Sequence, residues 1–351
     1  MRKTDYKYII IGAGVSGLTT AYYLLQNRET NFIILEGRDR IGGRVLTKNT
    51  IDFGPAWFQP NHKNLSQLLN NLGIEKFSQY SKGKSIMVYN TNGPAHYFES
   101  DQTQPSAYRI SGGSNNLIKK LSNFVEDKIV LNTQISKISE IENKIILTSN
   151  TNTFSAERVI NTLPPKLATT LNYSPKLPNE LNKVMHKTQT WMGHAIKVGI
   201  TYKTPFWREQ NNSGTIIGQF GAVTELYDHT NASKTNFSLM GFVNQELREV
   251  SAETRKEQIL AYLEKHLGSK ARNYLSYSEK DWAKDKFTSC PNLEDVYMSA
   301  HYGNPIFNSA YLNGKLLFSG TETAPYFGGY LEGAVISGIL SAQKLLNTTK
   351  N

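Results

Sequence analysis

The sequence lacks most of the features that mark disulfide-rich, metal-binding and membrane-spanning proteins. Its 351 residues include one cysteine, Cys290, which excludes an intramolecular disulfide and any zinc or iron–sulfur site built from several cysteines. The seven histidines show no metal-ligand spacing such as HExxH, so we predict no metal site. No apolar run approaches the roughly 18 to 20 residues of a membrane helix, so we predict no membrane span.

Blocks of like charge are absent as well. Lysine and arginine outnumber aspartate and glutamate by 39 to 29, a net charge of +10, but no run of about five or six like charges occurs. Nucleic-acid-binding arms and polybasic membrane anchors usually form such blocks, so we interpret the excess as a contribution to solubility and steering. The short apolar run after MRKTDYKY leads directly into GAGVSG, which indicates a buried strand rather than a signal peptide. We therefore expect a cytoplasmic protein with neither a nucleic-acid nor a membrane partner.

The sequence does contain enough apolar residues for a core, and a nucleotide-binding pattern near its start. Hydrophobic residues make up 39% of the chain and aromatic residues 11%, which excludes a disordered chain. We predict a buried strand at Tyr8–Ile11, a helix at 18–25 and a second strand at 31–36 that ends on an acid. The turn between the first strand and the helix is a GxGxxG pattern formed by Gly12, Gly14 and Gly17.

Each glycine of this pattern has a physical task. Gly12 allows a tight turn, Gly14 allows the backbone to approach a pyrophosphate, and Gly17 allows the helix to pack closely on the strand. The N–H groups and the dipole of the first helical turn favour the phosphate charge. Glu36 lies about 20 residues beyond the pattern, where a carboxylate holds ribose hydroxyls. This segment therefore predicts a dinucleotide site.

A second glycine pair follows, Gly42 and Gly43, and it is capped by Arg44. Together with the first pattern, this segment resembles the flavin-containing amine oxidase superfamily, which includes monoamine and polyamine oxidases. The resemblance implies that Gly43 and Arg44 face the FAD pyrophosphate, where a planar charged fork suits a diphosphate.

The next segment, DFGPAWF at 52–58, is similar to the family segment that passes beside the isoalloxazine ring. The resemblance assigns Gly54, Ala56 and Trp57 to that position, although Pro55 stands where a glycine is common in the family. Further along, the backbone near Ile135 is implied to contact the adenine.

The middle of the chain carries one candidate catalytic residue, Lys197. It lies in 193–202, which alternates apolar and polar residues and is predicted as a strand, followed by TPFWRE. This stretch resembles the amine oxidase segment that ends in PFWR, which implies that the Lys197 ammonium reaches flavin N5 through a water and tunes its chemistry. Without that motif, a lysine on an alternating strand is expected to point to solvent.

A second strong motif, TETAPYFGGYLEGAVISG, follows a predicted buried strand at 315–320. It resembles the C-terminal flavin signature of the same family. The resemblance implies that the N–H groups at the helix start meet the flavin pyrimidine edge, where they stabilise negative charge. It places Tyr330 in one wall of an aromatic substrate cage. The other cofactor-binding positions that it implies here are Gly320, Thr321, Glu322, Leu331 and Glu332.

The chain departs from the family pattern in three places. The stretch from Tyr80 to Arg109 is much shorter than the helical insertion of larger amine oxidases. Asn292 stands roughly where the second cage aromatic falls, with Tyr297 or Tyr302 as alternatives. Cys290 lies about one residue short of the position through which some monoamine oxidases attach flavin. We therefore predict non-covalent FAD and an inert buried thiol.

These patterns together predict an α/β protein in which a Rossmann-type FAD-binding domain with a parallel sheet is interleaved with a mixed-sheet α+β substrate domain. The FAD-binding domain is predicted to comprise 1–79, 110–186 and 287–351, and the substrate-binding domain 80–109 and 187–286. Two local predictions are a hairpin turning at Glu142–Asn143 and a helix over 251–267, capped by Ser251 and ended by Gly268.

The function implied by the resemblance is amine oxidation by an FAD-dependent oxidoreductase. Hydride would pass from an amine-bearing carbon to flavin N5, and O2 would reoxidise the flavin to give imine and hydrogen peroxide. One alternative is a renalase-like or desaturase-like flavoprotein that acts on a non-amine substrate. Another is a protein that binds FAD without turnover. No sequence feature identifies the physiological substrate or the oligomeric state.

Overall fold

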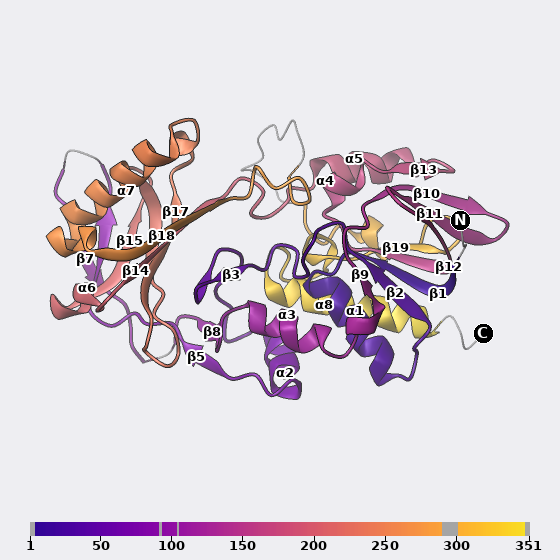
Figure 1. Cartoon of the computed structure of the whole chain (residues 1–351), viewed down its shortest axis with the longest axis horizontal. Helices are drawn as coiled ribbons and strands as arrows, with labels where there is room; N and C mark the ends of the chain where they lie inside the picture. Colours follow the sequence, from indigo (N-terminus) through magenta and orange to yellow (C-terminus); the bar gives the residue numbers. More distant parts are fainter. Residues whose placement is uncertain (1–3, 91–92, 104, 290–300, 348–351) are drawn as a thin grey trace.

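Two β-sheets, each assembled from separate stretches of the chain, form the two ends of an elongated molecule (Figure 1). The computed structural model describes residues 4–90, 93–103, 105–289 and 301–347. Both described chain ends belong to the same lobe, which carries the first sheet.

The first sheet has eight strands in the order β13-β10-β11-β12-β1-β2-β9, with β19 also paired to β12. The strands β9, β2, β1, β12 and β19 pair in parallel with one another, as the βαβ pattern predicts. The hairpin of β10 and β11 is antiparallel and adds to one edge. The strands are β1 (Thr4–Ile11), β2 (Phe32–Leu35), β9 (Ile129–Val130), β10 (Ile135–Ile141), β11 (Lys144–Ser149), β12 (Thr153–Asn161), β13 (Asn172–Ser174) and β19 (Leu316–Phe318).

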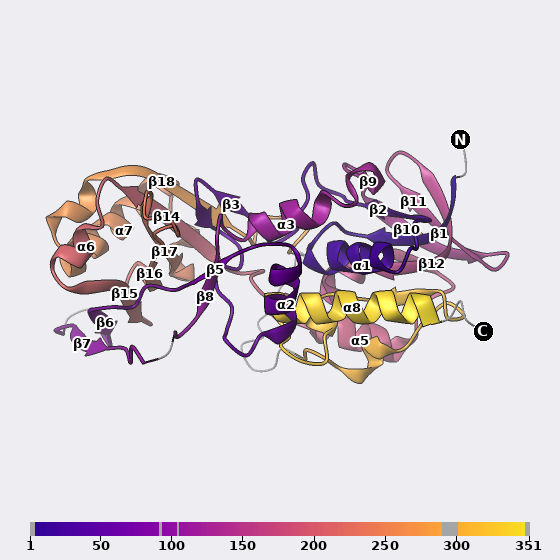
Figure 2. The same ribbon diagram turned by 90° about the horizontal axis from the view of Figure 1, so that it is seen from below.

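Helices cover both faces of this sheet because its central strands present apolar side chains to both faces. In β1, Tyr8 and Ile10 pack into one hydrophobic cluster, and Ile9 and Ile11 pack into another on the opposite face. Figure 2 shows α8 lying beside α1 and α2 on the first face. The helices of that face are α1 (Val15–Gln26), α2 (Lys63–Asn71), α3 (Asn115–Ser122) and α8 (Leu331–Asn347), and those of the other are α4 (Pro165–Ala168) and α5 (Asn179–Lys187).

The second sheet has seven strands in the order β18-β14-β17-β16-β15-β6-β7, mostly antiparallel. One of its faces packs on α7 (Ala252–Leu267), whose apolar stripe includes Ile259, Leu263 and Leu267. The strands are β6 (Lys84–Val88), β7 (His96–Glu99), β14 (Ile196–Tyr202), β15 (Asn212–Gly218), β16 (Val223–Asp228), β17 (Phe237–Val243) and β18 (Tyr274–Asp281), and a short helix α6 (Phe206–Glu209) follows β14.

Two small strand pairs lie between the sheets. One pair is β3 (Thr47–Lys48) with β4 (Ile51–Asp52), and the other is β5 (Lys76–Ser78) with β8 (Tyr108–Ile110). The chain segments that connect the two lobes at β5 and β8 therefore run side by side. They lie next to the domain boundaries predicted at 79/80 and 109/110. Those boundaries stay a prediction. Short 3-10 helices occur at Glu126–Lys128, Gln245–Arg248, Ser269–Arg272, Pro305–Asn308 and Thr321–Thr323.

The two local predictions are confirmed. The β10–β11 hairpin turns at Glu142 and Asn143, which both have positive φ angles. The Ser251 side chain accepts a hydrogen bond from the Thr254 N–H at the start of α7, and Gly268 ends the helix with a φ of +90°. Across the described ranges, no helix combines the length and the apolar character needed to cross a bilayer.

Candidate active site

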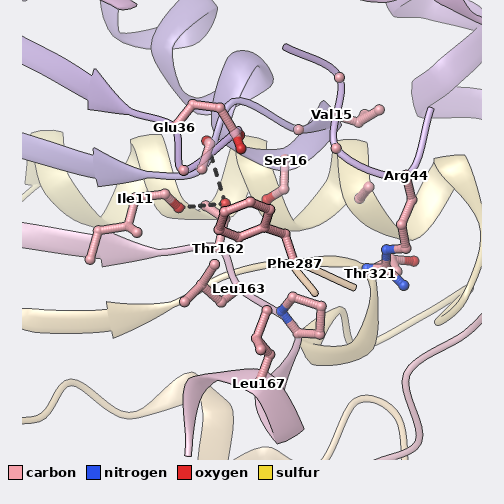
Figure 3. Close-up of a pocket in the computed structure, with 18 of the residues that line it drawn as sticks. Ile11, Val15, Ser16, Glu36, Arg44, Thr162, Leu163, Leu167, Phe287 and Thr321 are labelled. Atoms are coloured by element: carbon pink, nitrogen blue, oxygen red, sulfur yellow. Dashed lines mark hydrogen bonds between the residues drawn. The ribbon is translucent and has the colours of Figure 1, made fainter. Parts of the chain in front are cut away.

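A cavity with about 1260 Å³ of empty space, part of it open to solvent, lies at the carboxyl ends of β1, β2 and β12. Figure 3 shows Glu36 at one end of it, and Arg44 with Thr321 at the other. The carboxyl ends of parallel strands are the usual ligand position in such sheets. Ten predicted site residues line it: Gly12, Gly14, Glu36, Gly43, Arg44, Ile135, Gly320, Thr321, Tyr330 and Leu331.

The three glycines of the first turn differ in what surrounds them. Gly12 has a φ of +103°, which a side chain would strain. A Cβ atom on Gly14 would meet nothing within 4 Å, because this position faces the open cavity. A Cβ atom on Gly17 would lie 2.0 Å from the carbonyl oxygen of Gly12. Gly17 therefore does not line the cavity and serves the close packing of α1 on the turn.

This difference predicts opposite phenotypes for two alanine variants. Gly14→Ala should fold with a melting temperature near that of the wild type but retain less FAD, because its methyl group occupies ligand space. Gly17→Ala should lower the melting temperature of the apoprotein itself, because the backbone must move. Differential scanning fluorimetry of the apoproteins and flavin release on dilution separate the two effects. Equal melting temperatures for the two variants would contradict this assignment.

Glu36 is buried at the end of β2, and its carboxylate holds two backbone groups. Its oxygens accept the Ala13 N–H at 2.8 Å and the Arg38 N–H at 2.9 Å. The Thr162 hydroxyl donates to the carbonyl of Ile11 at 2.7 Å, which fixes the neighbouring strand end. Because each Glu36 oxygen accepts one backbone hydrogen bond, lone pairs remain for hydroxyl groups in the cavity.

The two arginines between Glu36 and Arg44 are both held by the protein. Arg38 forms an ion pair with Asp285 at 2.8 Å and lies over the ring of Phe287, on the Glu36 side of the cavity. Arg40 donates to the backbone carbonyls of Ile41, Val45 and Gly43. These hydrogen bonds stabilise the conformation of the second glycine loop.

Arg44 forms a two-pronged ion pair with Glu322, with N–O distances of 2.5 and 2.9 Å. Desolvation alone would lower the pKa of Arg44, but the charge and hydrogen bonds of the fully buried Glu322 raise it above its ordinary value. The fork that the sequence assigns to a diphosphate is thus engaged by a carboxylate. Glu322 itself does not line the cavity, whereas Arg44 does and keeps unused N–H donors there.

The DFGPAWF segment, except for Pro55, forms a layer behind the cavity. Gly54 is required because a Cβ atom there would lie 2.0 Å from the carbonyl of Arg44. Ala56 is buried, and the Trp57 indole donates to the Gln79 side chain at 2.8 Å. Of this segment, only Pro55 lines the cavity.

The PFWR motif joins that layer to the second sheet. Both the Trp207 indole and the Arg208 guanidinium donate to one carboxylate oxygen of the buried Asp228, each at 2.8 Å. Gln79 donates to the Asp228 carbonyl at 2.6 Å and accepts from Trp57. The motif is therefore structural, and it anchors the wall behind the cavity.

Lys197 is buried although an isolated lysine on its strand is expected to face solvent. All seven residues of β14 are buried: Ile196, Val198 and Ile200 face the α7 core, and a Cβ atom on Gly199 would lie 2.7 Å from Ile51. The second face of the sheet is thus covered by the segment that includes β4. Because both faces of β14 are covered, none of its side chains, including Lys197, faces solvent.

The Lys197 ammonium donates to the carbonyls of Asp52 and Gly54 at 2.9 and 2.8 Å. It also lies 4.9 Å from the Phe242 ring centroid and 5.6 Å from that of Trp57. Desolvation lowers the pKa of Lys197 to about 7, with Asp52 acting in the opposite direction. The ammonium does not line the cavity, but Gly54 directly precedes Pro55, which does.

Around Lys197 lies a cluster of buried polar side chains that the sequence did not predict. His229 accepts the Asp52 N–H at 3.1 Å, and burial lowers the pKa of His229 to about 3, which keeps it neutral. Arg109 is 3% exposed and donates to the carbonyl of Thr230. These residues come from distant segments with no shared motif, so no local pattern announces them.

The start of α8 brings Tyr330 and Leu331 to the cavity. Tyr330 is 50% exposed, its carbonyl accepts from Thr321, and its ring packs edge-on against His62 at 5.3 Å. The Glu332 side chain points away: it accepts hydrogen bonds from the N–H groups of Asn64 and Leu65, capping α2. Only the backbone of Glu332 is thus available at the helix start.

Part of the predicted aromatic cage lies outside the described residues, namely Asn292 and Tyr297, as does Cys290. Tyr302 is described, but it does not line the cavity. Its side chain packs against Gly328, where an added Cβ atom would lie 2.5 Å from the Tyr302 Cβ and 2.8 Å from the ring. Trp191 lines the cavity instead. It lies in a loop before β14 and belongs to no recognisable motif, so the sequence did not predict its position.

Comparison with known proteins identifies the family. The sequence matches the profile of the flavin containing amine oxidoreductases over residues 15–101 and 94–346, and the chain belongs to this family. Flavin-containing amine oxidase A of Equus caballus is 24% identical over 456 aligned residues, covering 97% of this chain and 85% of the relative. Flavin-containing amine oxidase B of Mus musculus is also 24% identical, with 97% and 86% covered.

Solved structures show the same fold. A putrescine oxidase bound to putrescine has a TM-score of 0.86 and 23% identity, and cyclohexylamine oxidase from Brevibacterium oxydans IH-35A has a TM-score of 0.85 and 20% identity. Each match covers 99% of this chain and 100% of the other. The alignment with the equine relative is 456 residues long against 351 in this chain, so that relative carries segments that this chain lacks.

The predicted fold class, family and cofactor are thereby confirmed: the chain is an FAD-dependent oxidoreductase of the flavin containing amine oxidoreductase family. The residues that line the cavity also fit FAD, independently of the comparisons. It is long, it has open space at Gly14 for a diphosphate, and Glu36 offers free lone pairs at the ribose position. Arg44 offers N–H donors near the α1 N-terminus, where anions are favoured.

Proposed function

We propose that this protein oxidises an amine at the carbon that bears the nitrogen, with O2 as the electron acceptor, to give an imine and hydrogen peroxide. The carbon–nitrogen single bond becomes a double bond as the substrate loses two electrons and two protons. O2 takes up these electrons and protons and becomes hydrogen peroxide. FAD, when bound, supplies the two-electron chemistry. The relatives named as amine, putrescine and cyclohexylamine oxidases support the choice of an amine.

The observation that carries this proposal is the buried ammonium of Lys197 behind the Pro55 wall. Two of its three N–H groups are fixed on the carbonyls of Asp52 and Gly54, so its position is set without substrate. In a site that excludes water, one fixed positive charge has a larger effect than it has in solution. The fixed ammonium of Lys197 would thus act on the reaction from behind the Pro55 wall.

The proposal predicts that purified protein is yellow and produces peroxide from amines. We expect FAD in equimolar amount with the chain, released on denaturation if it is held without a covalent bond. A peroxidase-coupled assay should be run with benzylamine, hexylamine, putrescine, amino acids and a dihydronicotinamide. Peroxide formed with at least one amine supports the proposal. Turnover of the dihydronicotinamide alone, or of no compound by flavin-loaded protein, would refute it.

A further inference from the structure

A chain of buried contacts leads from Lys197 to Arg109. The Lys197 ammonium donates to the carbonyl of Asp52 at 2.9 Å. The imidazole of His229 accepts the N–H of Asp52 at 3.1 Å and lies 3.5 Å from its carboxylate. The Arg109 guanidinium donates to the carbonyl of His229 at 3.4 Å and to that of Thr230 at 2.8 Å. Four segments that are distant in sequence, β14, β4, β8 and the turn after β16, therefore meet in one buried cluster.

The carboxylate of Asp52 is fixed inside this cluster. It is 1% exposed, and one of its oxygens accepts the Thr47 hydroxyl at 2.6 Å and the Ser114 N–H at 2.9 Å. Burial alone would raise the pKa of Asp52, but its contacts with His229, Thr47 and Ser114 lower it below its ordinary value. The cluster therefore holds one negative charge whose position is set by the protein itself.

Two buried cations lie around this single carboxylate, since Lys197 is 1% exposed and Arg109 is 3% exposed. Among the ion pairs of the described residues, Asp52 takes part only in the one with His229. His229 is neutral, because burial lowers its pKa to about 3, and Arg109 stays charged at neutral pH, because burial lowers its pKa only to about 10. Of these groups, only Lys197 can change its charge near pH 7.

The other titratable groups that face Lys197 come from β16 and β18. Glu225 on β16 also favours the charged form of Lys197, but its side chain is partly exposed to solvent. Its partner Tyr227 is neutral near pH 7, because burial raises the pKa of its hydroxyl. Lys280 lies opposite Lys197 on β18 and is paired with Asp285 at 3.1 Å. The two fully buried charges described above are therefore the ones least screened from the ammonium.

Resting on the proposed function, we infer that Asp52 and Arg109 are positioning residues that set the charge of the Lys197 ammonium in opposite directions. Asp52 holds the ammonium through its carbonyl and favours the charged form through its carboxylate. Arg109 favours the neutral form, because two positive charges repel each other strongly where water is excluded. The balance leaves Lys197 able to take up or release a proton near neutral pH.

The test measures the charge of Lys197 directly, without substrate. Flavin-loaded protein that carries ¹³Cε-labelled lysine is titrated by NMR, and the Lys197 signal is the one missing from Lys197→Met. Its midpoint, near pH 7 in the wild type, should fall by about one pH unit in Asp52→Asn, which removes the charge but keeps the carbonyl. It should rise by about one pH unit in Arg109→Gln, which removes the cation but keeps a donor.

Two controls separate charge from structural damage. Arg109→Lys keeps the positive charge and should titrate within about half a pH unit of the wild type. Trp207→Phe removes a buried hydrogen bond to Asp228 without changing a charge, so it should lower the melting temperature and leave the midpoint in place.

Opposite displacements of the midpoint in Asp52→Asn and Arg109→Gln support the inference, because loss of packing alone would not give them opposite signs. An unmoved midpoint in Asp52→Asn, or displacements of both variants in one direction, would overturn it. If Arg109→Gln does not fold, the midpoint of Asp52→Asn alone decides. Failure of the proposed function would show instead as an absence of turnover with every amine in the peroxide assay.

Discussion

Replacing Lys197 with methionine is expected to leave the FAD content near that of the wild type and to slow flavin reduction or reoxidation by at least about tenfold. Methionine keeps a long apolar stem in β14, so the sheet still packs. The ammonium, however, is lost, and the carbonyls of Asp52 and Gly54 lose their donor. Stopped-flow measurement of the two half-reactions shows which step depends on the charge.

The pKa of Lys197 also predicts how the rate changes with pH. Because desolvation lowers the pKa of Lys197 to about 7, the ammonium is charged below that pH and neutral above it. The step that uses its charge should therefore slow as the pH rises through about 7 in the wild type, and this transition should be missing in Lys197→Met. Lys203→Met, which alters an exposed lysine next to β14, is the matched control. Identical rates and pH profiles in the wild type and Lys197→Met would remove the catalytic role.

Arg44→Ala is expected to lower stability and FAD retention together. It leaves the fully buried Glu322 without a cation, and breaking such a pair costs about 3–5 kcal/mol. It also removes an N–H donor for the diphosphate, and a charge-assisted contact of this kind contributes about 1.5–3 kcal/mol. Chemical denaturation of the apoprotein measures the first effect, and flavin titration measures the second.

The double variant Arg44→Ala/Glu322→Gln separates the two roles of the arginine. It removes the unpaired carboxylate charge, so the stability of the apoprotein should recover in large part. FAD affinity should stay low if Arg44 contacts the diphosphate. Recovery of both quantities would mean that the arginine acts only as the partner of Glu322.

The first βαβ unit could be predicted because its signals are local. Three glycines and an acid at fixed spacing are read from a short stretch. Gly12 and Gly17 are required by the local backbone, and Gly14 faces the cavity. The same holds for the Ser251 cap, whose hydrogen bond spans three residues. Tyr330 and Leu331 likewise follow from a motif that places them at a helix start.

The remaining parts depend on contacts between distant segments. Lys197 is buried because the Ile51–Phe53 region covers its sheet face, which alternation within β14 does not reveal. The Arg44–Glu322 pair joins residues 278 positions apart, and the carboxylate of Glu332 caps a helix far away in sequence. Trp191 is placed by the hydrogen bonds of that ion pair to its backbone rather than by its own neighbours. Ion pairs and caps of this kind leave no periodic pattern.

The most direct test of the account is anaerobic mixing of the flavin-loaded protein with benzylamine, followed by admission of O2. We predict that the amine bleaches the visible absorbance of the oxidised flavin, and that O2 restores it with hydrogen peroxide equimolar to the flavin. Flavin that stays oxidised with benzylamine and with every other amine, while a dihydronicotinamide reduces it, would contradict amine oxidation as the function of this site.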